Sequence, residues 1–208
     1  MSMVVKGVKG GSKKNTALLS LLQPFTPLHV AFTGKSELKV LVSAEANGKP
    51  YLLKEQALFA GLYVNELLVR LLPEHIEYSD AYHHYQQVLE ILQHTETLEP
   101  PLRRFEKSLL ESLGYGVPFV EVDVIGRAIG LLQAMEYYRF VPESGFVRCL
   151  PQNSLGKNQI IFRGECLLQI ARDDLSGPEV VLQAKQLMRI VMVQRLGNKP
   201  LNSKLLFA

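Results

Sequence analysis

The amino-terminal segment carries a short lysine and glycine run whose side chains could bind a polyanion. Its basic residues are Lys6, Lys9, Lys13 and Lys14. Three glycines stand among them, and no acidic side chain occurs before Glu37. Closely spaced ammonium groups on a backbone that glycine lets approach a ligand suit the repeated phosphates of a nucleic acid. The run therefore predicts phosphate contacts, although a solvated basic loop would have the same composition.

A second candidate site is the pair Arg103 and Arg104, which follows the proline pair 100–101 in the first turn of an otherwise apolar helix. The amino-terminal end of a helix is itself positive, so cations there need acidic compensation. Glu99 and Glu106 could supply it from within the chain. The carboxylates of a bound partner are the alternative source.

Patterns typical of enzymes and metal sites are weak in this chain. The Gly-Lys-Ser sequence at 34–36 ends like a nucleotide phosphate loop, but His29 stands where that motif requires glycine. There is no GxSxG nucleophile motif, and Cys149 and Cys166 form no CxxC pair. Four further histidines lack the i, i+4 spacing of two ligands on one helical face: His75, His83, His84 and His94. We therefore expect no enzymatic activity, no catalytic residue, no metal and no cofactor.

The composition indicates a globular protein with segregated charge. Hydrophobic residues make up 47% of the 208-residue chain, enough to fill a core. Residues 1–50 hold seven basic and two acidic side chains, residues 51–112 hold five and ten, and residues 113–208 hold eleven and eight. A polyanion should therefore meet the two ends of the sequence rather than its middle. With two cysteines and no apolar run long enough for a membrane span, we expect a cytoplasmic location.

The lysine run belongs to a segment that favours short strands. Residues 4–8 and 28–32 are β-prone, and residues 37–44 alternate between apolar and polar side chains. Residues 33–36 are typical of the hairpin turn between the last two strands. Three strands cannot close a barrel alone, so this unit should lean on the following helices or leave an edge open.

The middle of the chain has a helical period. Residues 54–72 predict a nearly all-round apolar helix that stops at Pro73. A second helix is expected from about Ser79. A third should begin at the proline pair 100–101, which would place Arg103 and Arg104 in its first turn, and should end at Gly114.

The last third of the chain mixes strands and helices. Residues 125–135 favour a short helix, and residues 137–141 and 145–149 favour a hairpin. Residues 164–172 predict another short helix, and residues 178–196 a long one that ends before a glycine. Together these elements predict an α+β fold that is mainly α.

Four segments carry a resemblance to a known family. They are QPFTPL at 23–28, GLYVNELLVRLL at 61–72, LRRFEKSLLESLGYG at 102–116 and GNKPLNSKLLF at 197–207. Their order and spacing resemble those of the bacterial DNA-repair protein RecO family over almost the whole chain. Each motif is moderately specific by itself, and four in register are hard to obtain by chance.

The resemblance implies a domain organisation. Residues 1–50 would form a partial OB-fold DNA-binding domain, in which the lysine run is the third strand and the loop that leaves it. Residues 51–208 would form a helical bundle with a small hairpin-containing subdomain around 117–165. The family's OB fold has strands that would precede Met1, so either the true start lies upstream or the barrel is shortened. Some members carry a four-cysteine zinc site after the LGYG motif, but only two cysteines occur in that region here, so we expect a zinc-less subdomain.

The resemblance also implies a function. The family binds single- and double-stranded DNA, anneals complementary strands and works with RecR to load RecA onto DNA coated by single-stranded DNA-binding protein (SSB). The four lysines would then hold phosphates, and Arg103 and Arg104 would bind the acidic, apolar carboxyl-terminal tail of SSB. A nucleoid-associated location follows from the same resemblance.

Two alternatives remain open from the sequence. The protein could be an adaptor that binds the SSB tail and RecR through its helical body and holds DNA poorly. A nuclease or hydrolase would instead require carboxylates clustered around a metal.

Overall fold

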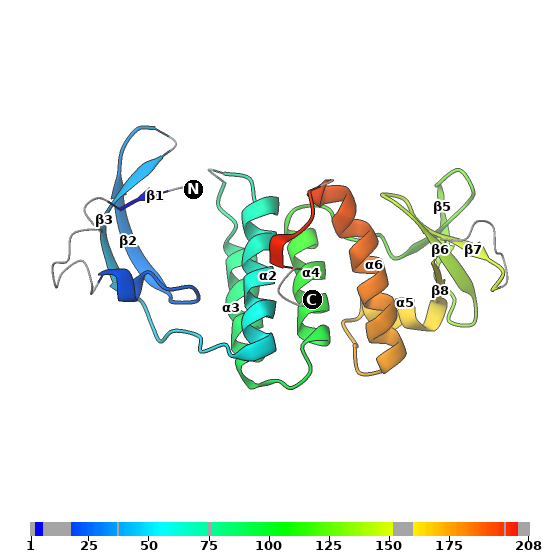
Figure 1. The fold of residues 1–208 in the computed structure, drawn as a ribbon. Helices are drawn as coiled ribbons and strands as arrows, with labels where there is room; N and C mark the ends of the chain where they lie inside the picture. The colour runs from blue at the N-terminus through cyan, green and yellow to red at the C-terminus, as the bar shows by residue number, and fades with distance from the viewer. Residues whose placement is uncertain are drawn as a thin grey trace.

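The computed structural model describes residues 3–5, 18–36, 38–74, 76–151, 160–197 and 199–203. A three-stranded sheet stands at one end of the molecule, a helical bundle fills the middle, and a five-stranded sheet lies at the other end (Figure 1). Helices therefore dominate, and strands form two separate small sheets. The predicted α+β class is confirmed.

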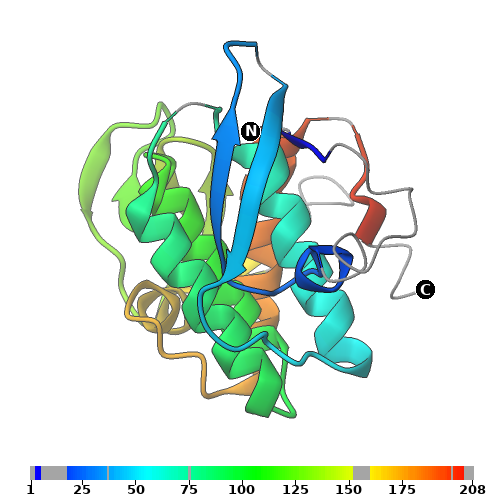
Figure 2. The same cartoon turned by 90° about the vertical axis from the view of Figure 1, so that its left-hand side faces the viewer.

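The amino-terminal sheet is formed by β1 (Met3–Val4), β2 (Leu28–Thr33) and β3 (Lys39–Ala46), in the order β1-β3-β2. Strand β2 runs antiparallel to β3, which confirms the predicted hairpin, and β1 runs parallel to β3. Gly34 in the turn has φ of +118°, a conformation that other residues rarely adopt. The hairpin projects beyond the ends of the helices (Figure 2). No residue of these three strands is buried, so they build no core of their own.

The central bundle contains α2 (Glu55–Leu71), α3 (Ser79–His94), α4 (Glu99–Ser112) and α6 (Pro178–Leu196). Helix α4 packs between α3 and α6, and α2 contacts both of those helices. One fully buried aliphatic side chain from each helix illustrates the shared core: Val64, Leu89, Leu109 and Leu187. Because burying each apolar side stabilises the others, the four helices form one cooperative unit. The four helices predicted for the bundle are confirmed.

A close contact at Gly61 joins the amino-terminal sheet to the bundle. Phe25 and Leu53 are both buried in the bundle core. A Cβ atom on Gly61 would lie 2.4 Å from Leu53 Cδ1 and 2.9 Å from Phe25 Cε1, so only glycine leaves room for them. The backbone N–H of Leu52 also donates a hydrogen bond of 2.8 Å to Gln93 Oε1. The segments around 25 and 61 that carried the resemblance therefore touch.

The second sheet has the strand order β5-β4-β7-β6-β8. Its strands are β4 (Val120–Val122), β5 (Ala128–Leu131), β6 (Tyr137–Val141), β7 (Gly145–Cys149) and β8 (Ile161–Arg163). Strands β6 and β7 form the predicted hairpin. An aromatic cluster fills one side of the sheet: Phe119, Phe140, Phe146 and Phe162. This packing gives the subdomain a small apolar core.

The helix predicted for residues 125–135 is wrong, because that segment forms β5 and the turns beside it. Asp123 Oδ1 accepts hydrogen bonds from the backbone N–H groups of Ile125 and Arg127, at 3.0 and 2.9 Å. Gly126 takes φ of +83° within this turn. An aspartate that bonds the backbone two residues later favours a turn over a helix, and this turn directs the chain back along β4.

Helix α5 (Gly164–Ala171) follows β8 directly and packs against α6. The backbone N–H of Gly164 donates to the carbonyl oxygen of Glu136 at 2.8 Å. A Cβ atom on Gly164 would lie 1.9 Å from the carbonyl oxygen of Gln133, which no side chain can tolerate. The predicted short helix is confirmed, and its start depends on a glycine.

Candidate functional site

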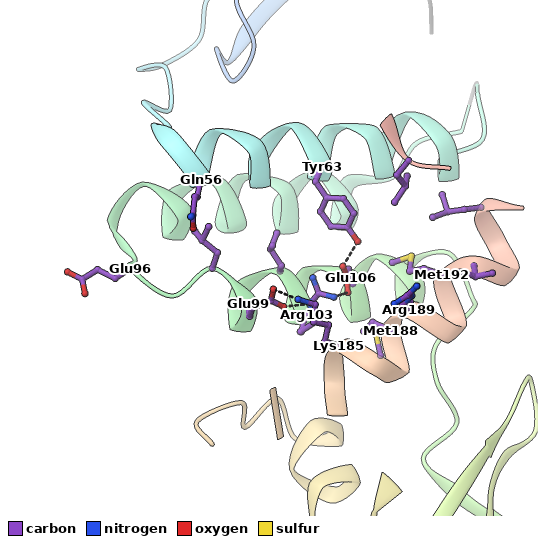
Figure 3. A pocket seen from close by; sticks show the side chains of 15 residues that line it. Gln56, Tyr63, Glu96, Glu99, Arg103, Glu106, Lys185, Met188, Arg189 and Met192 are labelled. Carbon is purple, nitrogen blue, oxygen red and sulfur yellow. Dashed lines mark hydrogen bonds and ion pairs between the residues drawn. The ribbon is translucent and has the colours of Figure 1, made fainter. Parts of the chain in front are cut away.

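An apolar groove of about 580 Å³ lies between α2, α4 and α6 (Figure 3). Its apolar lining includes Leu102, Met188, Met192, Val193, Leu196 and Leu201. Met188 and Met192 lie one turn apart on α6, and methionine side chains adapt to irregular apolar ligands. We call this space the central groove. Its size and lining suit a short apolar segment that contributes a few side chains.

Arg103 reaches from α4 into the central groove, although the residue is only 9% exposed. Its Nη1 lies 3.1 Å from Glu106 Oε2, and its Nε lies 3.7 Å from Glu99 Oε2. Both acids stand on the same helix, at i+3 and i−4, where they face Arg103. Glu99 and Glu106, the two acids that the sequence offers as partners, therefore both lie within ion-pair distance of Arg103.

Charge compensation at Arg103 is incomplete. Within the described ranges, Arg103 Nε and Glu106 Oε2 are buried and lack a well-aligned hydrogen bond. Buried polar atoms without such a bond are uncommon in folded proteins and often mark a functional position. One N–H group of the Arg103 guanidinium therefore has no acceptor among the described residues.

Tyr63 on α2 supports the buried carboxylate by donating a hydrogen bond to Glu106 Oε1. Burial raises the pKa of the Glu106 carboxyl, and the charge of Arg103 opposes that shift. Burial, together with the charge of Glu106, raises the pKa of Tyr63 well above its ordinary value of 10.0. The Tyr63 hydroxyl therefore remains a donor throughout the neutral range.

Two further cations border the groove from α6. Lys185 Nζ donates to Glu99 Oε1 at 2.7 Å. Arg189 lies one turn further along α6 and also lines the groove, and among the described residues no acid lies within ion-pair distance of it. The groove thus offers three cations beside an apolar floor (Figure 3). An acidic ligand with apolar side chains would match both features.

Arg104 lies outside the central groove. Its Nε donates to the carbonyl oxygen of Asp173 at 3.1 Å, and it borders a separate hollow of about 200 Å³ that Phe105 and His84 also line. Adjacent residues on a helix point about 100° apart, which separates the two arginines. The structure therefore brings only Arg103 of the predicted pair to the groove.

Lys107 on α4 holds the chain after α5 against this helix. Its Nζ donates to the carbonyl oxygen of Ala171 at 3.0 Å and to Asp173 Oδ1 at 2.8 Å. A cation at the carboxyl-terminal end of α5 is electrostatically favourable. Asp173, one of two adjacent aspartates, thus has a structural partner.

Two charged residues on α2, one acidic and one basic, hold the segment after α6 in place. Glu66 accepts hydrogen bonds from the backbone N–H groups of Asn202 and Ser203, both at 2.8 Å. Arg70 donates to the carbonyl oxygens of Leu196 and Lys199 at 2.9 and 2.7 Å. This contact joins two of the segments that carried the resemblance, and it holds Leu201 beside the groove.

The surroundings of Glu66 lower the pKa of its carboxyl group. Burial alone would raise its pKa, but hydrogen bonds from Ser203 and Asn202 and the charge of Arg70 outweigh burial and lower the pKa below its ordinary value of 4.5. The carboxylate is therefore ionised at neutral pH, which strengthens its hydrogen bonds.

The other predicted site residues receive no structural test. Lys6, Lys9, Lys13 and Lys14 lie outside the described residues.

Within the described ranges, no three His, Cys, Asp or Glu side chains gather closely enough to hold a metal ion. Burial raises the pKa of both Cys149 and Cys166. No helix in the described part of the chain has the length and apolar character needed to cross a membrane.

Sequence reasoning missed most of the groove. The sequence predicts a partner site at Arg103 with Glu99 and Glu106 as its neighbours, but no local pattern connects Tyr63, on another helix, to that site. The available signal was the pairing of basic residues with methionines along α6, at 185 and 189 and at 188 and 192. That spacing places a charged edge beside an apolar one on a single helix.

Comparison with known proteins matches this chain over most of its length. The family model described as "Recombination protein O C terminal" matches residues 56–205. "DNA repair protein RecO" of Coxiella burnetii (strain RSA 331 / Henzerling II) is 40% identical over 183 residues, which cover 88% of this chain and 76% of that protein. The protein of the same name from Pseudomonas paraeruginosa (strain DSM 24068 / PA7) is 40% identical over 204 residues, which cover 98% and 81%.

These matches include the bundle, the central groove and the second sheet, and they define a DNA repair and recombination protein. The chain belongs to the RecO family. The family predicted from four sequence segments is therefore confirmed.

Proposed function

We propose that this protein is a non-enzymatic recombination mediator whose central groove binds the carboxyl-terminal tail of SSB. The observation that supports this most is the meeting of Arg103, Lys185 and Arg189 beside an apolar floor. The SSB tail is acidic and apolar and ends in carboxylates. Guanidinium groups bind carboxylates with two parallel hydrogen bonds, and the apolar floor would hold the neighbouring side chains.

In this proposal the protein also binds single- and double-stranded DNA and anneals complementary strands. The lysine run would hold phosphates with little readout of bases. Neutralising the charge of two strands reduces their repulsion, while weak contacts leave the bases free to pair. With RecR, the protein would then help load RecA onto SSB-coated single strands. None of these steps requires a catalytic residue, and all fit a cytoplasmic, nucleoid-associated location.

The tail proposal is tested by fluorescence anisotropy with a labelled SSB-tail peptide and a labelled oligonucleotide. Arg189→Ala should weaken peptide binding about fivefold to tenfold and leave oligonucleotide binding unchanged. Arg189 is a better target than Arg103 because its removal leaves no buried acid unpaired. Arg127→Ala is the matched control, since Arg127 is an exposed arginine in the turn between β4 and β5, outside the groove. Equal peptide affinity for both variants would refute the assignment.

DNA binding is tested by the dependence on salt. If all four lysines contact a single strand, the logarithm of affinity should fall with the logarithm of salt concentration at a slope of about −3. A flat response would contradict the proposed phosphate contacts.

A second candidate function is an adaptor that binds the SSB tail and RecR and holds DNA weakly. The observation that favours it is the absence of any buried residue in β1, β2 and β3, because a sheet without a core presents a poorly ordered surface to DNA. Peptide binding without oligonucleotide binding in the same titrations would select this alternative.

A further inference from the structure

Glu99 occupies the position in the central groove that the carboxylate of a ligand would need. Its Oε1 accepts a hydrogen bond of 2.7 Å from Lys185 Nζ, and its Oε2 lies 3.7 Å from Arg103 Nε (Figure 3). The two cations belong to different helices, α6 and α4. One side-chain carboxylate of the protein thus bridges the cations on the two sides of the groove.

The bridge is weak on the Arg103 side. The distance of 3.7 Å exceeds that of a hydrogen bond, and among the described residues no other acceptor bonds the buried Nε atom. Arg103 is only 9% exposed, so water does not readily replace the missing acceptor. A closer carboxylate would therefore bind Arg103 better than Glu99 does.

We propose that Glu99 is an internal competitor that a ligand carboxylate must displace from Lys185 and Arg103. This inference rests on the proposed binding of an acidic, apolar peptide end in the groove. Arg189 would make the first contact, because no acid pairs with it in the described part of the chain. Exchange at Arg103 and Lys185 then follows, and Glu99 turns toward solvent.

The positions of the acids make this exchange feasible. The Glu99 side chain is 40% exposed and that of Lys185 is 54% exposed, and an ion pair at such positions contributes little stability. Glu99 Oε2, which faces Arg103, is buried but has no hydrogen bond to lose. Glu99 is also the first residue of α4, where a free carboxylate remains favourable beside the helix amino terminus. Glu106, at 1% exposure, stays buried and continues to hold Arg103.

The competitor would make the groove selective. The lining contains three acids, Glu96, Glu99 and Glu106, against the three cations, so the free groove has no net charge to attract anions in general. Only a ligand that brings a carboxylate and apolar side chains together gains enough to displace Glu99. A purely acidic or purely apolar peptide should bind poorly.

The test compares two forms of the labelled SSB-tail peptide, with a free carboxyl end and with an amidated end, on three full-length proteins. These are the unaltered protein, Glu99→Gln and the matched control Glu96→Gln, which removes the same charge from the same groove. Glu99→Gln should bind the free-carboxylate peptide about fivefold more tightly, which corresponds to about 1 kcal/mol. Glu96→Gln should change the affinity less than about twofold, because Glu96 pairs with neither cation among the described residues. The amidated peptide should distinguish the variants less.

The outcomes separate this inference from the function on which it rests. If the unaltered protein binds the peptide and Glu99→Gln binds it no more tightly, the competitor role is refuted while the tail site stands. An equal gain from Glu96→Gln also refutes it, because the effect would then be one of overall charge. If neither the unaltered protein nor Glu99→Gln binds the peptide, both the tail site and the competitor role of Glu99 are refuted.

Discussion

Arg103→Met should destabilise the protein much more than Glu106→Gln does. Without Arg103, the Glu106 carboxylate would remain 1% exposed and would have no ion-pair partner among the described residues. Removing one partner of a buried ion pair costs about 3 to 5 kcal/mol, and the imperfect alignment of this pair favours the lower end. We expect a loss of about 3 kcal/mol in the free energy of unfolding.

The reverse change is milder because each partner keeps a second contact. In Glu106→Gln, the Tyr63 hydroxyl can still donate to the amide oxygen, and Arg103 still faces Glu99. The loss should be about 1 to 2 kcal/mol. The double variant leaves no buried charge, so it should be about as stable as Glu106→Gln, which gives a coupling energy of about 3 kcal/mol, equal to the cost of Arg103→Met alone.

Urea unfolding of the four proteins, followed by circular dichroism, measures this cycle. Equal slopes of free energy against urea would show that the comparison concerns the folded state. Additivity of the two single changes within about 0.5 kcal/mol would refute the assigned ion pair.

Two further predictions concern the contacts made by Glu66 and by Gly164. Because the folded protein lowers the pKa of Glu66, the stability that Glu66 contributes is present above its unfolded pKa and is lost as pH falls through the folded value. Thermal unfolding between about pH 6 and about pH 3 should show this loss, and Glu66→Gln should reduce it; an unchanged pH profile would contradict the contact with Ser203. Gly164→Ala should cost about 2 kcal/mol or more, since its Cβ would meet the Gln133 carbonyl, whereas Gly130→Ala, with nothing within 4 Å, should be nearly neutral. Similar urea midpoints for these two variants would show that the close approach at Gly164 is absent.

Local sequence patterns predicted the elements well where local forces decide them. The bundle helices followed from periodicity and from terminators such as Pro73 and Gly114. The helix predicted for residues 125–135 is wrong because a single side chain, Asp123, accepts hydrogen bonds from the backbone that follows it, and the chain turns there. Apolar residues there satisfied a helical period just as well as a strand, so periodicity could not separate the two.

The central groove was harder to predict because its parts are distant in the chain. Arg103 was recognised as a cation in need of an acid, and the two acids offered within the chain are its partners. Lys185 and Arg189 lie on a helix that the sequence predicts, but no local pattern connects them to Arg103. Treating Arg103 and Arg104 as one site ignored the turn of the helix between them.

Composition and spacing alone predicted the helical body, the two hairpins β2–β3 and β6–β7 and the family, since these depend on periodic burial, turn residues and segments in register. Only the tertiary structure decided which charges meet. Electrostatic interactions depend on separation and burial in space, and packing of α2, α4 and α6 brings Tyr63, Arg103 and Lys185 to one groove. Arg104 lines another hollow, because the helix turns by about 100° between Arg103 and Arg104.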